Sequence, residues 1–202
     1  MALKLIATLR RLLRRRDGIA ALEFAFAFPI VLTIVIGIFE VSMILFVSSM
    51  LEGGLRDAAR FGITGSVPVG LTREQAIIEI VNSRMIGLVQ VQPADVKMRV
   101  YQCLANIRQP EPLTLDVNGN GKWDPGDTYT DVNGNGAWDA DMAASGAGGA
   151  GQVVVYDVLV NWHLMTPFLA PIFGNSGAIP IAASIAVRNE PWNINNTQTG
   201  IC

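Results

Sequence analysis

The chain has 202 residues, of which 50% are hydrophobic, and a formal net charge of -2 at pH 7. This length accommodates one folded domain and an accessory segment, and the hydrophobic content excludes a chain that is disordered throughout. Six of the fifteen basic residues lie in the first sixteen positions, so the chain after residue 18 has nine basic and sixteen acidic residues. A basic head on an acidic body argues against nucleic acid as a partner of the body, and it is typical of a membrane protein whose basic end stays in the cytoplasm.

The first apolar segment is long enough to cross a membrane. FAFAFPIVLTIVIGIFEVSMILFV, residues 24–47, contains a single charge, Glu40. As a helix it would extend about 36 Å, against a hydrocarbon core of about 30 Å. The sequence therefore predicts one membrane-spanning helix, with Glu40 facing a partner helix or lying near the far interface because a buried acid is costly. A cleaved secretory signal is the alternative, although its apolar region is usually only about 7–15 residues long.

The helical pattern continues beyond the apolar segment. SSMLEGGLRDAARFG, residues 48–62, keeps its apolar residues on or near one face. We therefore expect one helix over residues 19–62, with its transmembrane part at about 24–47. A second helix is predicted from Thr72 to about Gly87, because Thr72 and Gln75 have the spacing of a capping box.

Three strands are predicted in the second half of the chain. DVKMRVYQC, residues 95–103, and VVVYDVLVNWHL, residues 153–164, alternate apolar and polar side chains, and AIPIAASIAVR, residues 178–188, is the third candidate. We expect these strands to form an antiparallel sheet packed on the second half of the long helix, which makes the fold class α+β. His163, the only histidine, is interpreted as a strand residue on the polar face.

A tandem repeat of fifteen residues lies between the first two strands. DVNGNGKWDPGD starts at residue 116, and DVNGNGAWDADM starts at residue 131. In the twelve-residue calcium loop, oxygen ligands occupy the first, third, fifth, seventh, ninth and twelfth positions, and a glycine at the sixth permits the turn. Counted in this way, the ligands in the first copy are Asp116, Asn118, Asn120, the carbonyl of Lys122, Asp124 and Asp127.

The second copy matches the calcium loop less completely. Its candidate ligands are Asp131, Asn133, Asn135, the carbonyl of Ala137 and Asp139, with Met142 at the twelfth position and Asp141 as the nearest acid. This copy is therefore expected either to bind more weakly or to borrow a ligand from its neighbour. The repeat resembles the calcium loops of EF-hand-like and dockerin-like modules, so calcium is the predicted cofactor, although the twelfth-position glutamate and the flanking helices are missing. A pair of polar hairpin turns is the alternative, since Asn-Gly is a strong hairpin signal. Trp123 and Trp138 recur at one loop position and are expected to be packing residues over the site.

The repeat belongs to an expected insertion over about residues 110–151. The insertion ends in AASGAGGAG, residues 143–151, whose composition is typical of a flexible linker. We therefore expect little fixed structure there.

The two cysteines, Cys103 and Cys202, are far apart in the sequence. If the body of the protein lies in an oxidising compartment, a disulfide between them is expected to tie the C-terminal tail to the sheet. Two free thiols are the alternative.

The N-terminal segment resembles the precursor of a type IV pilin. GIAALE, residues 18–23, follows three arginines and resembles the site at which prepilin peptidase cuts after the glycine, so that the glutamate is the fifth residue of the mature chain. More narrowly, GIAALEFAFAFPIVLTIVIGIFE and the later LRDAARFG resemble the TadE-like proteins of tight adherence (Flp) pilus systems. VRNEP, residues 187–191, is similar to the end of their domain.

This resemblance implies a leader peptide, a retained helix and a pilin-like domain. Residues 1–18 are then a basic leader that is cut off between Gly18 and Ile19, and residues 63–202 form an extracytoplasmic α+β domain. The new amino group of Ile19 is expected to neutralise the Glu23 carboxylate of the same or a neighbouring chain. The alternative is that Glu23 lies at the cytoplasmic interface and meets lipid headgroups.

The implied function is that of a minor pilin or pseudopilin that takes part in the assembly of a Flp-type pilus for surface adhesion. The implied partners are prepilin peptidase, other pilins and pilus assembly proteins, and inner-membrane lipid. The implied location is the bacterial inner membrane, with a cytoplasmic N-terminus and a periplasmic domain, or the extracellular pilus.

A membrane-anchored calcium-binding adhesion protein that never enters a filament is the alternative function. An enzyme is not expected, because the sequence shows no nucleophile paired with a base, no set of cysteine and histidine metal ligands and no glycine-rich phosphate loop.

Overall fold

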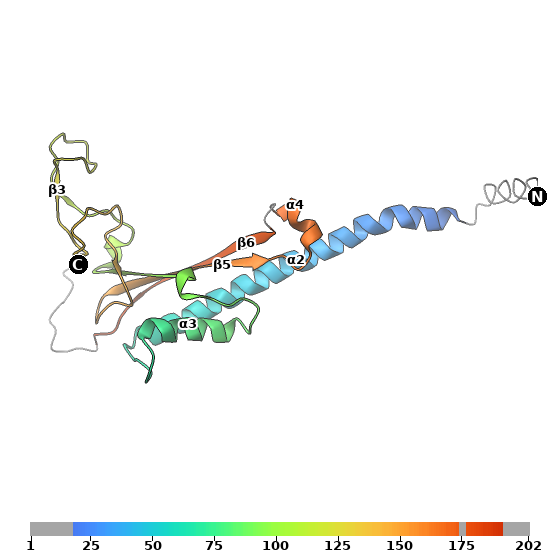
Figure 1. Ribbon diagram of the computed structural model, residues 1–202, viewed down its shortest axis with the longest axis horizontal. Helices are drawn as coiled ribbons and strands as arrows, with labels where there is room; N and C mark the ends of the chain where they lie inside the picture. Colours follow the sequence, from blue (N-terminus) through green and yellow to red (C-terminus); the bar gives the residue numbers. More distant parts are fainter. Residues whose placement is uncertain (1–17, 174–176, 192–202) are drawn as a thin grey trace, which may run out of the picture. The chain divides into compact units, whose positions relative to one another are not determined.

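The computed structural model describes residues 18–173 and 177–191 of the chain (Figure 1). All of the expected leader except Gly18 lies outside these residues. The chain divides into two compact units, residues 1–43 with 164–177 and residues 44–163 with 178–202. The N-terminal helix contributes to both units, and the sheet lies in the second.

Helix α2 (Ile19–Gly62) is continuous over 44 residues and starts directly after Gly18. Among the described residues it is the one helix long and apolar enough to cross a membrane, with a mean hydropathy of 2.7 in its most apolar window. Only 11% of that window is buried, whereas the core helix of a soluble protein is mostly buried. The predicted helix over residues 19–62 is therefore confirmed, and its length and composition are those of a membrane anchor.

The second unit contains a four-stranded antiparallel sheet. Its strand order is β4 (Ala144–Ser145), β1 (Val96–Tyr101), β5 (Val153–His163) and β6 (Ala178–Arg188). The long strands β5 and β6 pair over their whole length, and β1 pairs with the first half of β5. This sheet confirms the three predicted strands, their antiparallel pairing and the α+β fold class.

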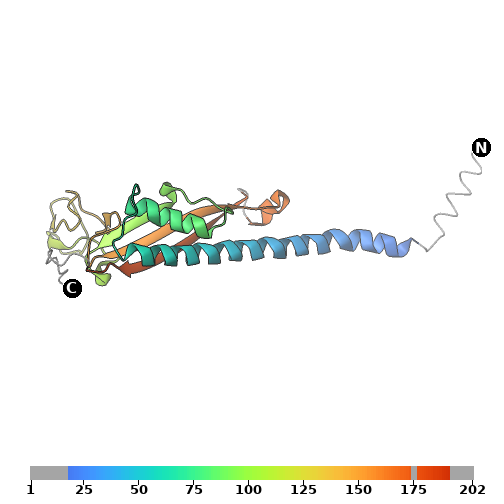
Figure 2. The same cartoon turned by 90° about the horizontal axis from the view of Figure 1, so that it is seen from below.

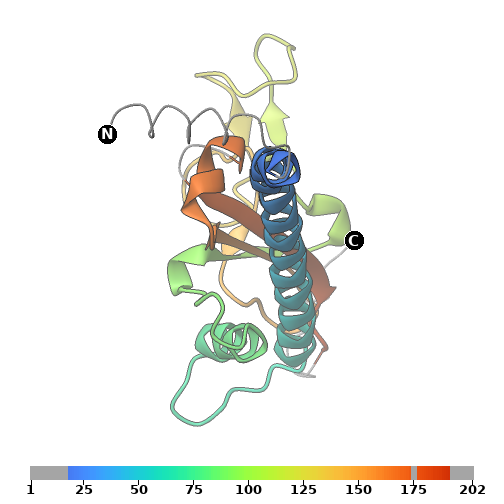
Figure 3. The ribbon, with the colours of Figure 1, turned by 90° about the vertical axis from the view of Figure 1, so that its right-hand side faces the viewer.

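One face of the sheet is buried against the second half of α2 and against α3 (Arg73–Arg84), as Figures 2 and 3 show. Alternate residues of β5 point into this core, and Val154, Tyr156, Val158 and Val160 are each at most 2% exposed. Leu51 and Leu55 of α2 are buried to the same degree. The strand's apolar alternation thus predicted which of its residues form the core.

A capping box begins helix α3, and a glycine of α2 allows the two helices to pack closely. Thr72 and Gln75 form the predicted capping box, in which the Thr72 hydroxyl accepts the Gln75 N–H at 3.2 Å. A Cβ atom on Gly54 would lie 3.1 Å from Arg84 Cβ and 3.3 Å from the Val81 carbonyl oxygen. The glycine therefore allows α3 to lie close against α2.

The insertion covers one end of the opposite sheet face. β2 (Leu113–Leu115) and β3 (Thr128–Tyr129) pair into a separate small sheet at the base of the first loop. A second apolar cluster brings together strand residues, residues of the second copy of the repeat and residues that flank the repeat, namely Tyr101, Val153, Val155, Val132, Met142, Ile107 and Ala143. The insertion is therefore packed onto the sheet by its own small core.

The expectation of little fixed structure over residues 143–151 is wrong. Ala144 and Ser145 form β4 and pair with β1, and Ala147 is only 3% exposed. The side-chain amide of Asn189 donates to the carbonyls of Ala147 and Gly149 at 3.1 and 3.0 Å. Hydrogen bonds from distant parts of the chain therefore order a segment whose composition is that of a linker.

Candidate functional site

The predicted processing residues lie at the start of α2. The Gly18 carbonyl accepts the N–H of Leu22 at 3.0 Å, which begins the helical hydrogen-bond pattern. A Cβ atom at Gly18 would meet no described atom within 4 Å. Ile19 and Glu23 are exposed. None of the described atoms therefore packs against the Gly18 position.

Glu40, the second acid of α2, is met by a residue of the same chain. Its side chain is fully buried, and its Oε1 accepts the N–H of Thr166 at 2.6 Å and also the Thr166 hydroxyl. Thr166 lies in the connection between β5 and β6. The expectation that Glu40 faces a partner helix is therefore not needed to explain this side chain.

Each copy of the repeat folds around its first aspartate. Asp116 accepts the N–H of Gly119 through Oδ1 and that of Gly121 through Oδ2, both at 2.7 Å. Asp131 makes the same two bonds at 2.6 and 2.8 Å. The four donor glycines have φ between 70° and 79°, in the region that favours glycine. The backbone N–H groups, foremost that of the sixth position, lower the pKa of both carboxyls, which favours the ionised form.

Side chains of the third and fifth positions converge on the ninth. The amide nitrogens of Asn118 and Asn120 donate to Asp124 Oδ2 at 2.8 and 2.6 Å, and these two bonds lower the pKa of Asp124. The second copy repeats the arrangement, with 2.8 and 2.5 Å to Asp139 Oδ2. In both copies, three of the predicted ligands therefore meet at one point.

The twelfth-position acid comes from different places in the two copies. Asp127, 7% exposed, accepts the N–H groups of the second and ninth positions of the first loop at 2.9 and 2.8 Å. Glu111, 1% exposed, accepts the corresponding N–H groups of Val132 and Asp139 at 2.7 and 3.1 Å. Glu111 therefore takes in the second loop the place that Asp127 has in the first.

Asp141, the candidate ligand nearest to the twelfth position of the second loop, points elsewhere. It accepts the Tyr101 hydroxyl at 2.9 Å and a guanidinium N–H of Arg99 at 3.0 Å. Sequence reasoning missed Glu111 because this residue precedes the whole repeat, and loop spacing counts only residues inside the loop. The signal that could have identified it is the presence of a glutamate, Glu111, shortly before a repeat whose second copy has no acid at its twelfth position.

The two tryptophans join the two loops. The rings of Trp123 and Trp138 stack with centroids 5.9 Å apart, and Tyr129 meets Trp123 edge-on at 5.1 Å. The Trp138 Nε1–H donates to the Glu111 carbonyl at 3.1 Å. These residues are packing residues, as expected, but they pack on each other and thereby fix one loop against the other.

The types of donor atom in the two loops support calcium binding, but a compact cluster of acidic side chains is not seen among the described residues. Among the described residues, no group of three or more histidine, cysteine, aspartate or glutamate side chains is gathered closely enough to hold a metal ion. The loops do combine carboxylate, amide and carbonyl oxygens in the order that a calcium loop uses. The donor types therefore fit calcium, and its binding stays a prediction.

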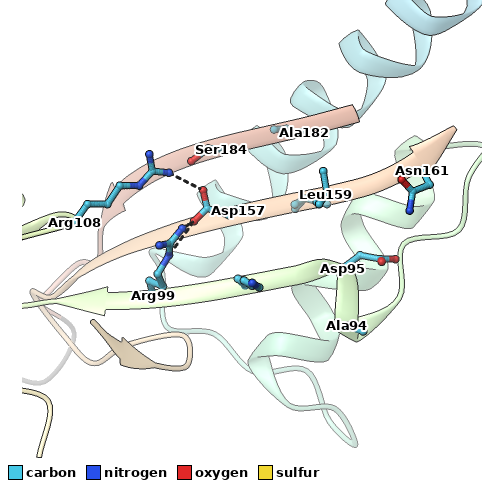
Figure 4. A pocket seen from close by; sticks show the side chains of 12 residues that line it. Ala94, Asp95, Arg99, Arg108, Asp157, Leu159, Asn161, Ala182 and Ser184 are labelled. Carbon is cyan, nitrogen blue, oxygen red and sulfur yellow. Dashed lines mark hydrogen bonds and ion pairs between the residues drawn. The ribbon is translucent and has the colours of Figure 1, made fainter. Parts of the chain in front are cut away.

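An ion-pair network lines a shallow pocket on the open face of β1, β5 and β6 (Figure 4). Arg99 donates to Asp157 Oδ2 at 2.5 and 3.1 Å, and Arg108 reaches Asp157 Oδ1 at 3.2 Å. Burial raises the pKa of Asp157, but the Ser184 hydroxyl and the two arginines outweigh it and leave this pKa below its ordinary value. Since Arg99 also pairs with Asp141, the network fastens the insertion to the sheet.

The two stretches that resemble TadE-like proteins meet at the end of α2. The N–H of Glu190, in VRNEP, donates to the carbonyl of Ile63 at 2.9 Å. Gly62 lies directly against Tyr156 of β5, because a Cβ atom there would be 2.6 Å from the Tyr156 hydroxyl oxygen. The end of α2 and the VRNEP stretch therefore belong to one packed region.

The predicted disulfide lies partly outside the described residues. Cys103 follows β1 and is only 6% exposed. Cys202 is outside the described part of the chain. The pairing of the two cysteines stays a prediction.

The chain matches one protein-family model, and the matched residues are almost the same as those of α2. Residues 18–60 match the family model described as TadE-like protein. The match starts at Gly18 and ends two residues before the end of α2, so it covers the helix and leaves out the sheet and the insertion. Neither the curated proteins nor the solved structures contain a significant match to the chain. Over its N-terminal segment, residues 18–60, the chain is similar to the TadE-like proteins.

Proposed function

We propose that the protein is a minor pilin or pseudopilin of a tight adherence (Flp) pilus. The observation that carries this proposal is the TadE-like match that begins at Gly18 and follows α2. Large apolar side chains of the helix, such as Phe26 and Ile30, are 72% and 65% exposed. Such a helix anchors a protein in a membrane before assembly and packs against other helices in a filament, with a basic N-terminus on the cytoplasmic side.

Processing by prepilin peptidase between Gly18 and Ile19 is part of the proposal. The helix begins at Ile19, so the cut would remove the basic leader and leave the helix whole. It would also create an α-amino group with an ordinary pKa of about 7.7–8.0. In a low-dielectric assembly this cation and the exposed Glu23 carboxylate would offset each other's charge, within one chain or between neighbours.

Mass spectrometry of the protein expressed with an active prepilin peptidase tests the cut. We expect a mature N-terminus at Ile19 for the wild type and an uncut chain for Gly18→Leu. Gly37→Leu is the matched control, since a Cβ atom at Gly37 also meets nothing within 4 Å; it should be cut normally. A wild-type N-terminus at Met1 or Ala2 would contradict the processing proposal.

Fractionation of cells into sheared pili and inner membrane tests assembly. The wild type is expected in the pilus fraction or to be required for pili to form, and Glu23→Ala is expected to reduce piliation. Glu52→Ala is the matched control, because Glu52 is an exposed glutamate on the same helix. Normal fibres with Glu23→Ala would argue against an assembly role for this carboxylate.

We further propose that the two loops bind calcium. The support is the convergence of three predicted ligands in each copy and the buried acids Asp127 and Glu111 at equivalent places. The residues that would hold the ion are those at the first, third, fifth, seventh, ninth and twelfth positions, and the ion would neutralise their carboxylates and order the loops.

Calcium addition to the full chain in detergent should change tryptophan fluorescence, because Trp123 and Trp138 stack between the loops. Asp116→Ala with Asp131→Ala should abolish the response. Equal responses of wild type and double variant, or none at millimolar calcium, would exclude the loops as calcium sites.

The calcium loops also favour the second candidate function, an anchored adhesion protein outside the filament. In that case the protein would stay in the membrane fraction after pili are sheared off, and cells lacking it would keep their pili.

A further inference from the structure

The connection between β5 and β6, residues 164–177, is apolar, and its described part lies along α2. It contains a 3-10 turn, η3 (Pro167–Leu169), and the short helix α4 (Ala170–Phe173), which lies beside α2 in Figure 1. The Leu164 N–H donates to the Gly177 carbonyl at 2.9 Å and closes the connection. The sequence from residue 158 to residue 187 contains no aspartate, glutamate, lysine or arginine.

This connection has an apolar inner side and an apolar outer side. Inward, Leu169 is 1% exposed and, with Phe173, lines an apolar groove against the Thr33–Ser42 part of α2, which the mostly exposed Ile172 also borders. Outward, Met165, Phe168 and Ile172 are 57%, 58% and 70% exposed. A loop that ends in water would not gain from presenting three large apolar side chains.

Glu40 marks the level along α2 at which the connection docks. Its Oε1 accepts both donors of Thr166, and its Oε2 has no hydrogen-bond partner among the described residues. The acid is therefore shielded from lipid by its own chain. The 21 helical residues before it, Ile19–Phe39, extend about 31 Å, which matches a hydrocarbon core of about 30 Å.

We propose that the outer boundary of the membrane lies at Glu40 and that residues 164–173 of the β5–β6 connection rest in the outer leaflet, with Met165, Phe168 and Ile172 in contact with lipid. The groove on α2 reaches back to Thr33, seven residues before Glu40, which is about 10 Å. Interfacial segments bury their apolar face about 5–10 Å deep. The proposal rests on the membrane anchoring proposed above, and it moves the spanning part from residues 24–47 to residues 19–39.

The backbone of the connection suits this depth. Irregular backbone is tolerated near lipid only where its polar groups are satisfied within the protein. Pro167 and Pro171 have no N–H to satisfy. The N–H of Thr166 donates to Glu40, and that of Leu169 donates to the Thr166 carbonyl at 3.0 Å.

Lipid explains the exposed side chains better than a single partner helix does. At the level of the connection, α2 also exposes Ile34, Val35, Ile38 and Phe39, which spread over an arc of about 140° around the helix axis. Together with the outer side of the connection they form an apolar band. A bilayer surrounds such a band, whereas one partner helix covers only a side of it.

Photocrosslinking of the full chain in vesicles of phosphatidylethanolamine and phosphatidylglycerol tests the proposal. A benzoylphenylalanine replaces Phe168, Ile34 or Val69 in turn. Ile34 reports on α2 itself, and Val69 is the water-exposed control, since it is fully exposed in the loop between α2 and α3. Mass spectrometry then distinguishes lipid adducts from protein adducts.

We expect lipid adducts at positions 168 and 34, with yields several-fold above that at position 69. Lipid adducts at position 34 combined with protein adducts or none at position 168 would overturn the inference and leave the anchor intact. No lipid adduct at position 34 would overturn the anchoring itself, and the inference with it.

Discussion

Replacing Gly62 by alanine puts a methyl group into space that is already filled. The new Cβ would lie 2.6 Å from the Tyr156 hydroxyl oxygen, 3.4 Å from Tyr156 Cζ and 3.5 Å from Ile77 Cδ1. Tyr156 is fully buried in the sheet core, so its ring cannot swing into solvent. The end of α2 or the ring must therefore shift.

The expected loss of folding free energy is the cost of overpacking minus the gain in helix propensity. Overpacking a core typically costs about 1–3 kcal/mol. Alanine is favoured over glycine inside a helix by up to about 1 kcal/mol, and by less at the last helical residue. The free energy of unfolding should therefore fall by about 1–2 kcal/mol. In a domain of about 150–250 residues, each 1 kcal/mol lowers Tm by about 2–4 °C.

Thermal unfolding of the full chain in detergent, followed by circular dichroism, measures this loss. Tyr156→Phe removes the atom that clashes, and the Tyr156 hydroxyl has no hydrogen-bond partner among the described residues. That variant alone should be close to wild type in stability, since an unpaired buried hydroxyl contributes little. In the Tyr156→Phe background, Gly62→Ala should hardly change the free energy of unfolding. The double-mutant cycle would then give a coupling energy between the two positions of about 1 kcal/mol or more.

Two results would refute the reasoning. Gly62→Ala with wild-type Tm would show that the end of α2 relaxes freely away from β5. An equal loss in the wild-type and Tyr156→Phe backgrounds would show that the hydroxyl is not the cause.

Three further predictions concern the insertion and the sheet. Glu111→Gln and Asp127→Asn should both weaken the calcium-dependent fluorescence change, whereas Asp141→Asn should not; a calcium titration compares the three, and an unchanged response of Glu111→Gln would contradict the role of this acid. The folded-state pKa of Asp157 lies below its unfolded value of about 3.9, so its stabilisation is present above that pH and is lost as pH falls through the folded value. Urea unfolding should therefore show the advantage of wild type over Asp157→Asn shrinking below about pH 4; an advantage that is constant with pH would contradict this. Asn189→Ala leaves two carbonyls of the 147–149 turn without their donor and should lower the free energy of urea unfolding by about 1–3 kcal/mol; an unchanged urea midpoint would show that the turn does not depend on this amide.

The elements that sequence reasoning predicted correctly are those with a local cause. Apolar length and periodicity identified α2 over its full extent, and alternation identified β1 and β5 and the core residues of β5. The capping pair Thr72 and Gln75 marked the start of α3, although its end at Arg84 is earlier than the predicted Gly87. The N-terminal family signature was also readable, because its residues are contiguous.

The candidate sites were only partly predictable. The loop spacing identified the aspartates and asparagines that converge at the ninth position in each copy. It failed at the twelfth position of the second copy, where spacing placed Met142 with Asp141 as the nearest acid, whereas Glu111 makes the contacts that Asp127 makes in the first copy. Nothing in the order of residues around Glu40 indicates Thr166, which is 126 positions away.

The sequence by itself therefore determined the membrane-type helix, the strands of the sheet and the residues of the two loops, because each depends on neighbours within a few positions or one helical turn. Only the tertiary structure decided which acid completes the second loop, what shields Glu40, and that the glycine-rich segment after the repeat is ordered. Each of these depends on a hydrogen bond between residues far apart in the chain, and such a bond forms where the fold happens to bring a donor to an acceptor. Composition and periodicity depend only on nearby residues, so they cannot predict which distant residues will form such a hydrogen bond.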